Sequence, residues 1–284
     1  TGVELAGSIA ELRNKVLPKD YPQLSFKNMR VILVESGGSL LSGLTPKSRE
    51  KALQYLQELG VEVMLNTRVE DYDGFIVKLL DKEPIKTLTL LWAAGIKANS
   101  LIGVEDDQKA PNGRLLVDEF NKMVNEENIY VVGDQCVQKE EKFPNGHPQV
   151  AQVAIQQAAN LAKNFKNELK GKPWIPFKYN DLGSMATIGK KMAVVDLPFV
   201  SFQGSFAWLV WLFVHLMAIL GVKNKLFIFL DWSWNYLSFD PSLRLLIKPK
   251  YVRASERKEL IEEKEHHHRQ RLLRKLDQHK ETRM

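Results

Sequence analysis

The chain has 284 residues, 44% of them apolar, which predicts a globular protein of about two domains. Its single cysteine, Cys136, excludes a disulfide framework and a two-cysteine redox couple, and it fits a reducing compartment. The net charge of +6 is concentrated at the C-terminus, where residues 244–284 carry 13 Lys and Arg against 7 Asp and Glu.

The start of the chain predicts a helix and then a strand. Residues 8–12 have a helical pattern, and residues 31–35 form an apolar strand that ends at Glu35. Gly2, Glu4 and Gly7 precede this helix and are candidates for a nucleotide site. This order indicates the second half of a dinucleotide-binding βαβ unit, whose first strand and leading glycines we expect before Thr1. In such a unit the helix N-terminus faces a pyrophosphate and the strand-end acid bonds a ribose 2′-hydroxyl. The alternative is a helix–strand pair with incidental glycines.

Four further elements follow before residue 100. The pattern predicts a helix over Pro46–Leu59 ended by Gly60, a strand over Val61–Leu65, a hairpin over 69–80 turning at Asp73-Gly74, and a buried strand over Leu88–Ala94. The last strand ends at Gly95, where small residues leave room for a ligand.

The middle of the chain repeats the strand-and-helix order. Residues 129–134 predict a buried strand that ends in Gly133 and Asp134, where open α/β sheets bind ligands; a simple strand-ending turn is the alternative. An Ala/Gln-rich helix follows over 148–162, with Gln152 and Gln156 on one face. Its small residues permit the close approach of a planar ring, or simply pack the helix.

Short strands are expected over 177–200, around Gly183 and Gly189, and then the chain becomes strongly apolar. Residues 206–222 are apolar except for His215 and Gly221, and a second apolar stretch covers 226–230. Neighbouring tryptophans and lysines favour a membrane-surface anchor; a buried core helix is the alternative. The pattern leaves open whether 206–222 spans the bilayer or re-enters it.

Two other chemistries find little support. His266, His267 and His268 point in different directions on a helix, so we expect no metal site. We expect Cys136 to be a small buried residue. The basic tail has no aromatic side chain besides Tyr251 that could stack on bases, so no nucleic-acid partner is expected.

Taken together, these motifs resemble type II, non-proton-pumping NADH dehydrogenases, which are membrane-surface flavoproteins. The resemblance runs from Thr1 to about Tyr236 and is carried by Thr1–Gly7, Leu91–Gly95, Tyr130–Asp134 and Pro148–Gln156. It implies an α/β fold, part of a Rossmann-like flavoprotein with two dinucleotide-binding domains and a C-terminal membrane-anchoring region. It also implies hydride transfer from NADH to FAD, and then transfer of two electrons to a quinone.

The resemblance assigns each site residue a role. Gly2, Glu4 and Glu35 would hold NADH, with Gly95 near the nicotinamide. Gly133 and Asp134 would bind FAD, and Ala151 would lie against the isoalloxazine. Gln152 would also contact the flavin and, with Gln156, would line the quinone tunnel as the catalytic pair. The chain from about 206, with its basic tail, would dock on the cytoplasmic face of the inner membrane.

The implied domains are an NADH-binding domain (1–98), the C-terminal part of an FAD-binding domain (99–200), an amphipathic anchor (201–240) and a charged tail (241–284).

The chain departs from the family pattern in two ways. The FAD glycine fingerprint is missing, so we expect the segment alone to be inactive, and Leu182 occupies a place where the family often has a basic residue. The rivals are a related flavoprotein quinone or disulfide reductase and a non-catalytic membrane-surface module. The identity of the quinone and the formation of a homodimer stay open.

Overall fold

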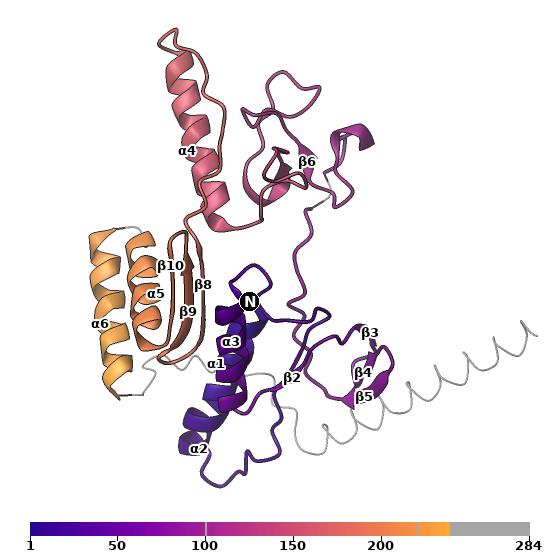
Figure 1. Ribbon diagram of the computed structural model, residues 1–284, viewed down its shortest axis with the longest axis vertical. Helices are drawn as coiled ribbons and strands as arrows, with labels where there is room; N and C mark the ends of the chain where they lie inside the picture. Colours follow the sequence, from indigo (N-terminus) through magenta and orange to yellow (C-terminus); the bar gives the residue numbers. More distant parts are fainter. Residues whose placement is uncertain (100, 220, 239–284) are drawn as a thin grey trace, which may run out of the picture. The chain divides into compact units, whose positions relative to one another are not determined.

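The computed structural model describes residues 1–99, 101–219 and 221–238, and these form two compact units (Figure 1). The first unit contains residues 1–93 and the described chain from Ser184 onward, and the second contains residues 94–183. Along the sequence, the second unit is therefore an insertion into the first.

The first unit begins with a continuous helical segment. It consists of α1 (Gly2–Glu11), a π-helical turn (Leu12–Val16) and α2 (Leu17–Asp20). Pro18 explains the irregular middle, because proline has no N–H to donate to the preceding turn. The buried side of α1 consists of Val3, Ala6, Gly7 and Ala10, all small or branched, which permits close packing.

A pair of parallel strands connected by a helix follows. The elements are β1 (Ile32–Val34), α3 (Pro46–Glu58) and β2 (Glu62–Met64). The predicted helix is confirmed, and local signals set its ends. The Thr45 hydroxyl accepts a 3.4 Å hydrogen bond from the Ser48 N–H, and Gly60 follows the helix with a φ of +75°.

The predicted hairpin is part of a three-stranded antiparallel sheet. Its strands are β3 (Val69–Tyr72), β4 (Ile76–Leu79) and β5 (Lys82–Lys86). The Asp73 carboxylate accepts hydrogen bonds of 2.8 Å from the N–H groups of both Phe75 and Ile76, and Gly74 has a φ of +95°. The turn chemistry of Asp-Gly therefore places the hairpin where the sequence predicts it.

A second antiparallel sheet completes the core of the first unit. Its strands are β8 (Ser184–Gly189), β9 (Met192–Leu197) and β10 (Val200–Gln203). Alternate residues of a strand face opposite sides. Accordingly, Ile188 and Val194 join a core with α1 and α3, while Ala193 and Val195 join a smaller cluster with Ala207 of α5.

Two helices end the described chain, α5 (Ser205–Ala218) and α6 (Val222–Ser238), and they lie side by side next to this sheet (Figure 1). The apolar stretch over 206–222 is thus interrupted before its end, at Ile219, whose backbone is extended. Across the part of the chain described, no helix is both long and apolar enough to cross a membrane. The large apolar side chains that these helices expose include Phe206, Leu209, Phe213, Leu226, Phe227 and Trp234.

The second unit has one long helix and otherwise short elements. They are a 3₁₀ turn (Asp106–Gln108), β6 (Leu115–Leu116), a 3₁₀ turn η3 (Gly133–Gln135), β7 (Cys136–Val137) and α4 (Ala151–Glu168). The strands β6 and β7 pair in parallel, and α4 packs against η3. The predicted Ala/Gln-rich helix is confirmed and continues beyond residue 162.

Two predicted strands do not form. Residues 88–94 make no ladder with any described residue, and Leu88, Leu91 and Trp92 are exposed. In the predicted strand over 129–134, Tyr130 makes only an isolated bridge to Lys122, Ile129 is exposed, and Gly133 and Asp134 belong to a 3₁₀ turn. An apolar run becomes a strand only where a neighbour supplies hydrogen bonds, and composition alone does not reveal that neighbour.

Candidate functional site

The start of α1 lies over β1, as expected for a dinucleotide-binding unit. A Cβ atom placed on Gly2 would lie 3.5 Å from Leu33 Cδ1 and 3.7 Å from Ala93 Cβ. Glu4 follows on the same helix and is half-buried. Gly7 serves packing rather than a ligand, because a Cβ atom there would lie 1.7 Å from the carbonyl oxygen of Ile188 in β8.

Glu35 directly follows β1, and the next loop fixes its carboxylate. Its Oε1 accepts a 2.7 Å hydrogen bond from the Gly37 N–H and a 3.3 Å hydrogen bond from the Ser36 hydroxyl. Its Oε2 accepts none from any residue that the structure describes. One oxygen is thus held in place, and the other is available to a hydroxyl donor.

Gly133, Asp134 and the first turns of α4 lie together in the second unit. The Gly133 N–H donates a 2.7 Å hydrogen bond to Oε1 of the buried Gln157, and a Cβ atom on Gly133 would lie 3.1 Å from Ala154 Cβ. The Asp134 carbonyl accepts a hydrogen bond from Gln149 at 3.0 Å. The Asp134 side chain is exposed, and its carboxylate accepts no hydrogen bond from a described residue.

The α4 helix begins without a side-chain cap, because its N-cap residue is Val150. Its first N–H groups therefore have no side-chain acceptor, and the helix dipole adds partial positive charge there. Ala151 is exposed at this end of the helix. A negatively polarised group could bind at this position without displacing a protein side chain.

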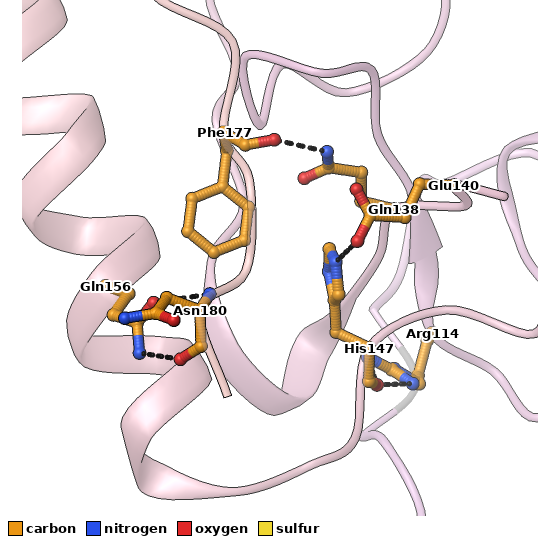
Figure 2. A network of polar contacts seen from close by, with 7 residues as sticks. All are labelled: Arg114, Gln138, Glu140, His147, Gln156, Phe177 and Asn180. Atoms are coloured by element: carbon orange, nitrogen blue, oxygen red, sulfur yellow. Dashed lines mark hydrogen bonds and ion pairs between the residues drawn. The ribbon is translucent and has the colours of Figure 1, made fainter. Parts of the chain in front are cut away.

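Both carboxamides predicted for the quinone tunnel bond to backbone. Gln152 donates to the Gly183 carbonyl and accepts from the Leu182 N–H, each at 3.1 Å. Gln156 donates to the Asn180 carbonyl at 2.9 Å and accepts from the Asn180 N–H at 3.0 Å, as Figure 2 shows. The Leu182 side chain itself is exposed.

The same contact continues along α4. Asn160 and Asn164 donate to the Ile175 carbonyl at 3.1 and 2.9 Å, and Asn164 also accepts from the Ile175 N–H at 2.9 Å. Asn167 donates to the Pro173 carbonyl at 3.2 Å. We call residues 173–183 the strap, and the side chains that hold it, Gln152, Gln156, Asn160, Asn164 and Asn167, the carboxamide ladder. Their spacing of mostly four residues was the signal that could have revealed them.

A buried polar network that the sequence did not single out lies beside the strap (Figure 2). His147 is 1% exposed, and its Nε2 lies 3.0 Å from Glu140 Oε1. Its carbonyl accepts from both terminal nitrogens of Arg114 at 3.2 Å. Gln138 donates to the Phe177 carbonyl at 3.2 Å. Burial lowers the pKa of Arg114, although Cys136 and Asp134 act in the opposite direction.

Two further side chains have shifted acidities. Burial raises the pKa of Tyr179 to about 12, and the carboxylate of Asp181 adds to this. Burial also raises the pKa of Cys136, which is fully buried and donates to the Gly133 carbonyl at 3.4 Å. Cys136 is thus a small buried residue, as predicted.

The predicted site residues therefore fall into two groups. Gly2, Glu4 and Glu35 lie around β1 in the first unit, whereas Gly133, Asp134, Ala151, Gln152 and Gln156 lie at or near the start of α4 in the second. Gly95 belongs to the second unit, where it is exposed with a φ of +86°. The histidines at 266–268 and the basic tail lie outside the described residues.

Comparison with known families gives two consecutive matches. Residues 1–158 match the pyridine nucleotide-disulphide oxidoreductases, and residues 182–238 match the NDH2 C-terminal domain. The second match covers β8–β10, α5 and α6.

Individual relatives give the same result. The chain is 36% identical over 252 residues to the type II NADH:quinone oxidoreductase Ndh of Mycobacterium tuberculosis, covering 84% of this chain and 52% of that protein. It is 28% identical over 234 residues to a probable NADH dehydrogenase of Dictyostelium discoideum, covering 82% and 51%. Plasmodium falciparum NDH2, solved in complex with NADH, has a similar fold with a TM-score of 0.74 and 20% identity, covering 85% of this chain and 65% of that one. The chain spans about half the length of the relatives it matches in sequence.

Proposed function

Since the chain belongs to the pyridine nucleotide-disulphide oxidoreductases, within the type II NADH dehydrogenases, we propose that the protein is an FAD-dependent, non-proton-pumping NADH:quinone oxidoreductase. The observation that carries this proposal is the gathering of Gly133, Asp134 and Gln152 at one end of α4. They lie in a chain whose following residues match the NDH2 C-terminal domain.

The surroundings of Glu35 support NADH as the electron donor. The fixed carboxylate offers Oε2 to a ribose hydroxyl, and its negative charge disfavours a 2′-phosphate. Gly2 at the start of α1 lets a pyrophosphate approach the helix N-terminus. Gly95 and Glu4 complete the proposed NADH set.

The residues at the start of α4 fit FAD. The exposed Asp134 carboxylate is an acceptor for ribityl hydroxyls, the uncapped α4 N-terminus suits a negatively polarised ring, and Ala151 leaves space beside it. Bound FAD would supply the two-electron relay between donor and acceptor. The protein residues would hold and orient it and exclude water.

The quinone is proposed to bind beside Gln152 and Gln156. Each carboxamide keeps one rigid orientation, because both of its ends bond to the strap. They would shape one wall of the quinone site and position its ring.

The exposed apolar faces of α5 and α6 support a peripheral position on the cytoplasmic face of the inner membrane. An exposed apolar helix face suits the headgroup boundary, and a quinone would be found in the same membrane. The basic tail would add attraction to anionic lipid.

The test is made on the full-length protein expressed in a host that supplies FAD. We expect stoichiometric FAD absorbance that bleaches on addition of NADH, reoxidation by a soluble quinone, and a preference for NADH over NADPH. The test variant Asp134→Ala should lose FAD occupancy while it remains folded. A colourless full-length protein that binds vesicles but oxidises no NADH would overturn the proposal and favour the membrane-surface module.

A further inference from the structure

The loop directly after Glu35 carries hydrogen-bond donors that the proposed NADH contacts do not use. We call residues 36–39 the donor loop. The Glu35 carbonyl accepts a 2.9 Å hydrogen bond from the Thr67 N–H, and the Gly37 carbonyl accepts one of 3.0 Å from the Asn66 N–H. These two donors follow β2, so the donor loop is held at the carboxyl edge of the paired strands β1 and β2. Dinucleotide-binding units bind the adenosine ribose at this edge.

Several donors of this loop have no acceptor among the described residues. The Gly37 N–H donates to Glu35, but the N–H groups of Gly38 and Ser39 donate to no described group. The Ser39 hydroxyl accepts a hydrogen bond from Arg49 and retains its own proton for a further acceptor. Gly38 is exposed and Ser39 is half-buried. An anion could therefore accept hydrogen bonds from this set without displacing a protein acceptor.

Arg49 adds a positive charge to these donors. It belongs to α3, and its Nη1 donates to the Ser39 hydroxyl at 3.2 Å. Its Nε is buried without a hydrogen-bond partner in the part of the chain described. The guanidinium also forms no ion pair with a described carboxylate, including that of Glu35. Since arginine stays ionised in proteins, its charge beside the donor loop is not neutralised by a neighbour.

Glu35 opposes the binding of an anion to this loop. A Cβ atom placed on Gly37 would lie 3.2 Å from Glu35 Oε1 and 3.8 Å from the carbonyl oxygen of Ser39. The carboxylate and the end of the donor loop thus border the same space. A neutral ribose hydroxyl next to Glu35 is accepted there, whereas the negative charge of a phosphate is repelled by the carboxylate and attracted by Arg49.

We propose that the donor loop and Arg49 form a phosphate-monoester subsite beside the proposed ribose position, and that the charge of Glu35 opposes its use. The ligand group is the 2′-phosphate of NADPH or of a similar nucleotide. Successive backbone N–H groups, a hydroxyl and a guanidinium are the donors that proteins commonly offer to phosphate. The inference rests on the nucleotide site proposed above and adds an anionic ligand class to it.

This role of Arg49 differs from simple support of the loop in its consequences. If Arg49 only held Ser39 in place, its loss would weaken all nucleotides that bind at Glu35 to the same extent. A guanidinium that binds the phosphate affects only the nucleotides that carry a 2′-phosphate. Two nucleotides that differ in this group alone therefore separate the two roles.

The experiment measures the affinities of adenosine 2′,5′-bisphosphate and of adenosine 5′-phosphate by calorimetry on full-length, FAD-loaded protein. It compares wild type, Glu35→Gln, Arg49→Gln and the double variant. We expect Glu35→Gln to bind the bisphosphate at least about tenfold more tightly than wild type, equivalent to about 1.4 kcal/mol. Addition of Arg49→Gln should remove most of this gain. The affinity for adenosine 5′-phosphate should be equal with and without Arg49.

Two further variants control for charge and folding. Lys47→Gln in the Glu35→Gln background removes an exposed cation from the first turn of the same helix and should leave the gain intact. Arg49→Lys in that background keeps the charge and should retain part of the gain, even if Arg49→Gln folds poorly. The ratio of kcat/KM for NADPH to that for NADH should follow the same order among the variants.

Three results would overturn the inference: no gain in Glu35→Gln, a gain that survives the loss of Arg49, or an equal loss of both nucleotides in Arg49→Gln. The binding measurements do not depend on quinone reduction. A protein whose nucleotide affinities follow the expected order but which reduces no quinone would therefore refute the proposed function alone.

Discussion

At the scale of single residues, Gly7 shows most clearly how little space the core leaves. Any Cβ atom would collide with the backbone of Ile188, which cannot move without disturbing β8. We expect Gly7→Ala to lower the free energy of unfolding by at least about 2 kcal/mol, in the upper part of the range for overpacked cores. Urea denaturation followed by circular dichroism measures this. Gly43→Ala is the matched control, because no atom lies within 4 Å of its added methyl group, and equal losses in both variants would refute the argument.

Asp196 is a second residue whose environment decides stability. Burial acts to raise its pKa, but hydrogen bonds from the Ser48 hydroxyl (2.7 Å), the Thr45 N–H (2.6 Å) and the Thr45 hydroxyl (3.1 Å) outweigh it, so the pKa is lowered. This carboxylate on β9 thereby holds the N-terminus of α3. The folded-state pKa lies below the unfolded one, so its stabilisation is present above the unfolded pKa and is lost as pH falls through the folded pKa.

We therefore expect Asp196→Asn to cost about 1.5 to 3 kcal/mol at neutral pH, the range for a hydrogen bond to a charged group. The difference from wild type should shrink as the solution is acidified below about pH 4, near the ordinary aspartate pKa. Chemical denaturation at a series of pH values checks both statements. Asp71→Asn, at an exposed position of β3, should have little effect at any pH. A constant difference down to strongly acidic pH would contradict the assignment of the effect to this carboxylate.

At the scale of elements, the carboxamide ladder explains how the strap stays in place without secondary structure of its own. Asn164 is fully buried and makes both of its hydrogen bonds to the backbone of Ile175. We expect Asn164→Ala to lower the free energy of unfolding by about 1 to 3 kcal/mol, because it removes a buried side chain together with its two part-buried hydrogen bonds to Ile175. Asn160→Ala, which removes one exposed hydrogen bond, should cost clearly less. Limited proteolysis within 173–183 should accelerate in the first variant, and equal rates in both would contradict this account.

Elements with local signals were predictable, and those that depend on distant partners were not. Thr45, Pro46 and Gly60 mark the ends of α3 in the sequence itself, and Asp73-Gly74 marks its hairpin. Leu88–Ala94 has the composition of a buried strand but pairs with no strand among the described residues. In the candidate site, the positions of Gln152 and Gln156 on one helical face were predictable from their spacing. Their partner, the strap, was not, because nothing local encodes which segment returns along α4.

At the scale of the molecule, the sequence order hides which parts share a core. Gly7 lies near the start of the chain and β8 follows the whole second unit, yet the two are in direct contact. The helix that supports the proposed NADH site therefore also supports the sheet on which α5 packs. A disrupted shared core should impair the proposed cofactor binding and the proposed membrane association together, whereas a disrupted second unit should impair the proposed cofactor binding without the membrane association.

The proposed membrane association can be tested on the exposed faces of α5 and α6. Phe213 and Phe227 are 62% and 61% exposed, and burial of each in lipid is worth about 1.5 to 3 kcal/mol. We expect the double variant Phe213→Asp, Phe227→Asp to bind anionic vesicles at least about a hundredfold more weakly in a flotation assay. Leu169→Asp is the control, because Leu169 is 88% exposed but lies at the end of α4. Equal loss of binding in both would mean that general surface hydrophobicity, and not the α5–α6 face, holds the protein on lipid.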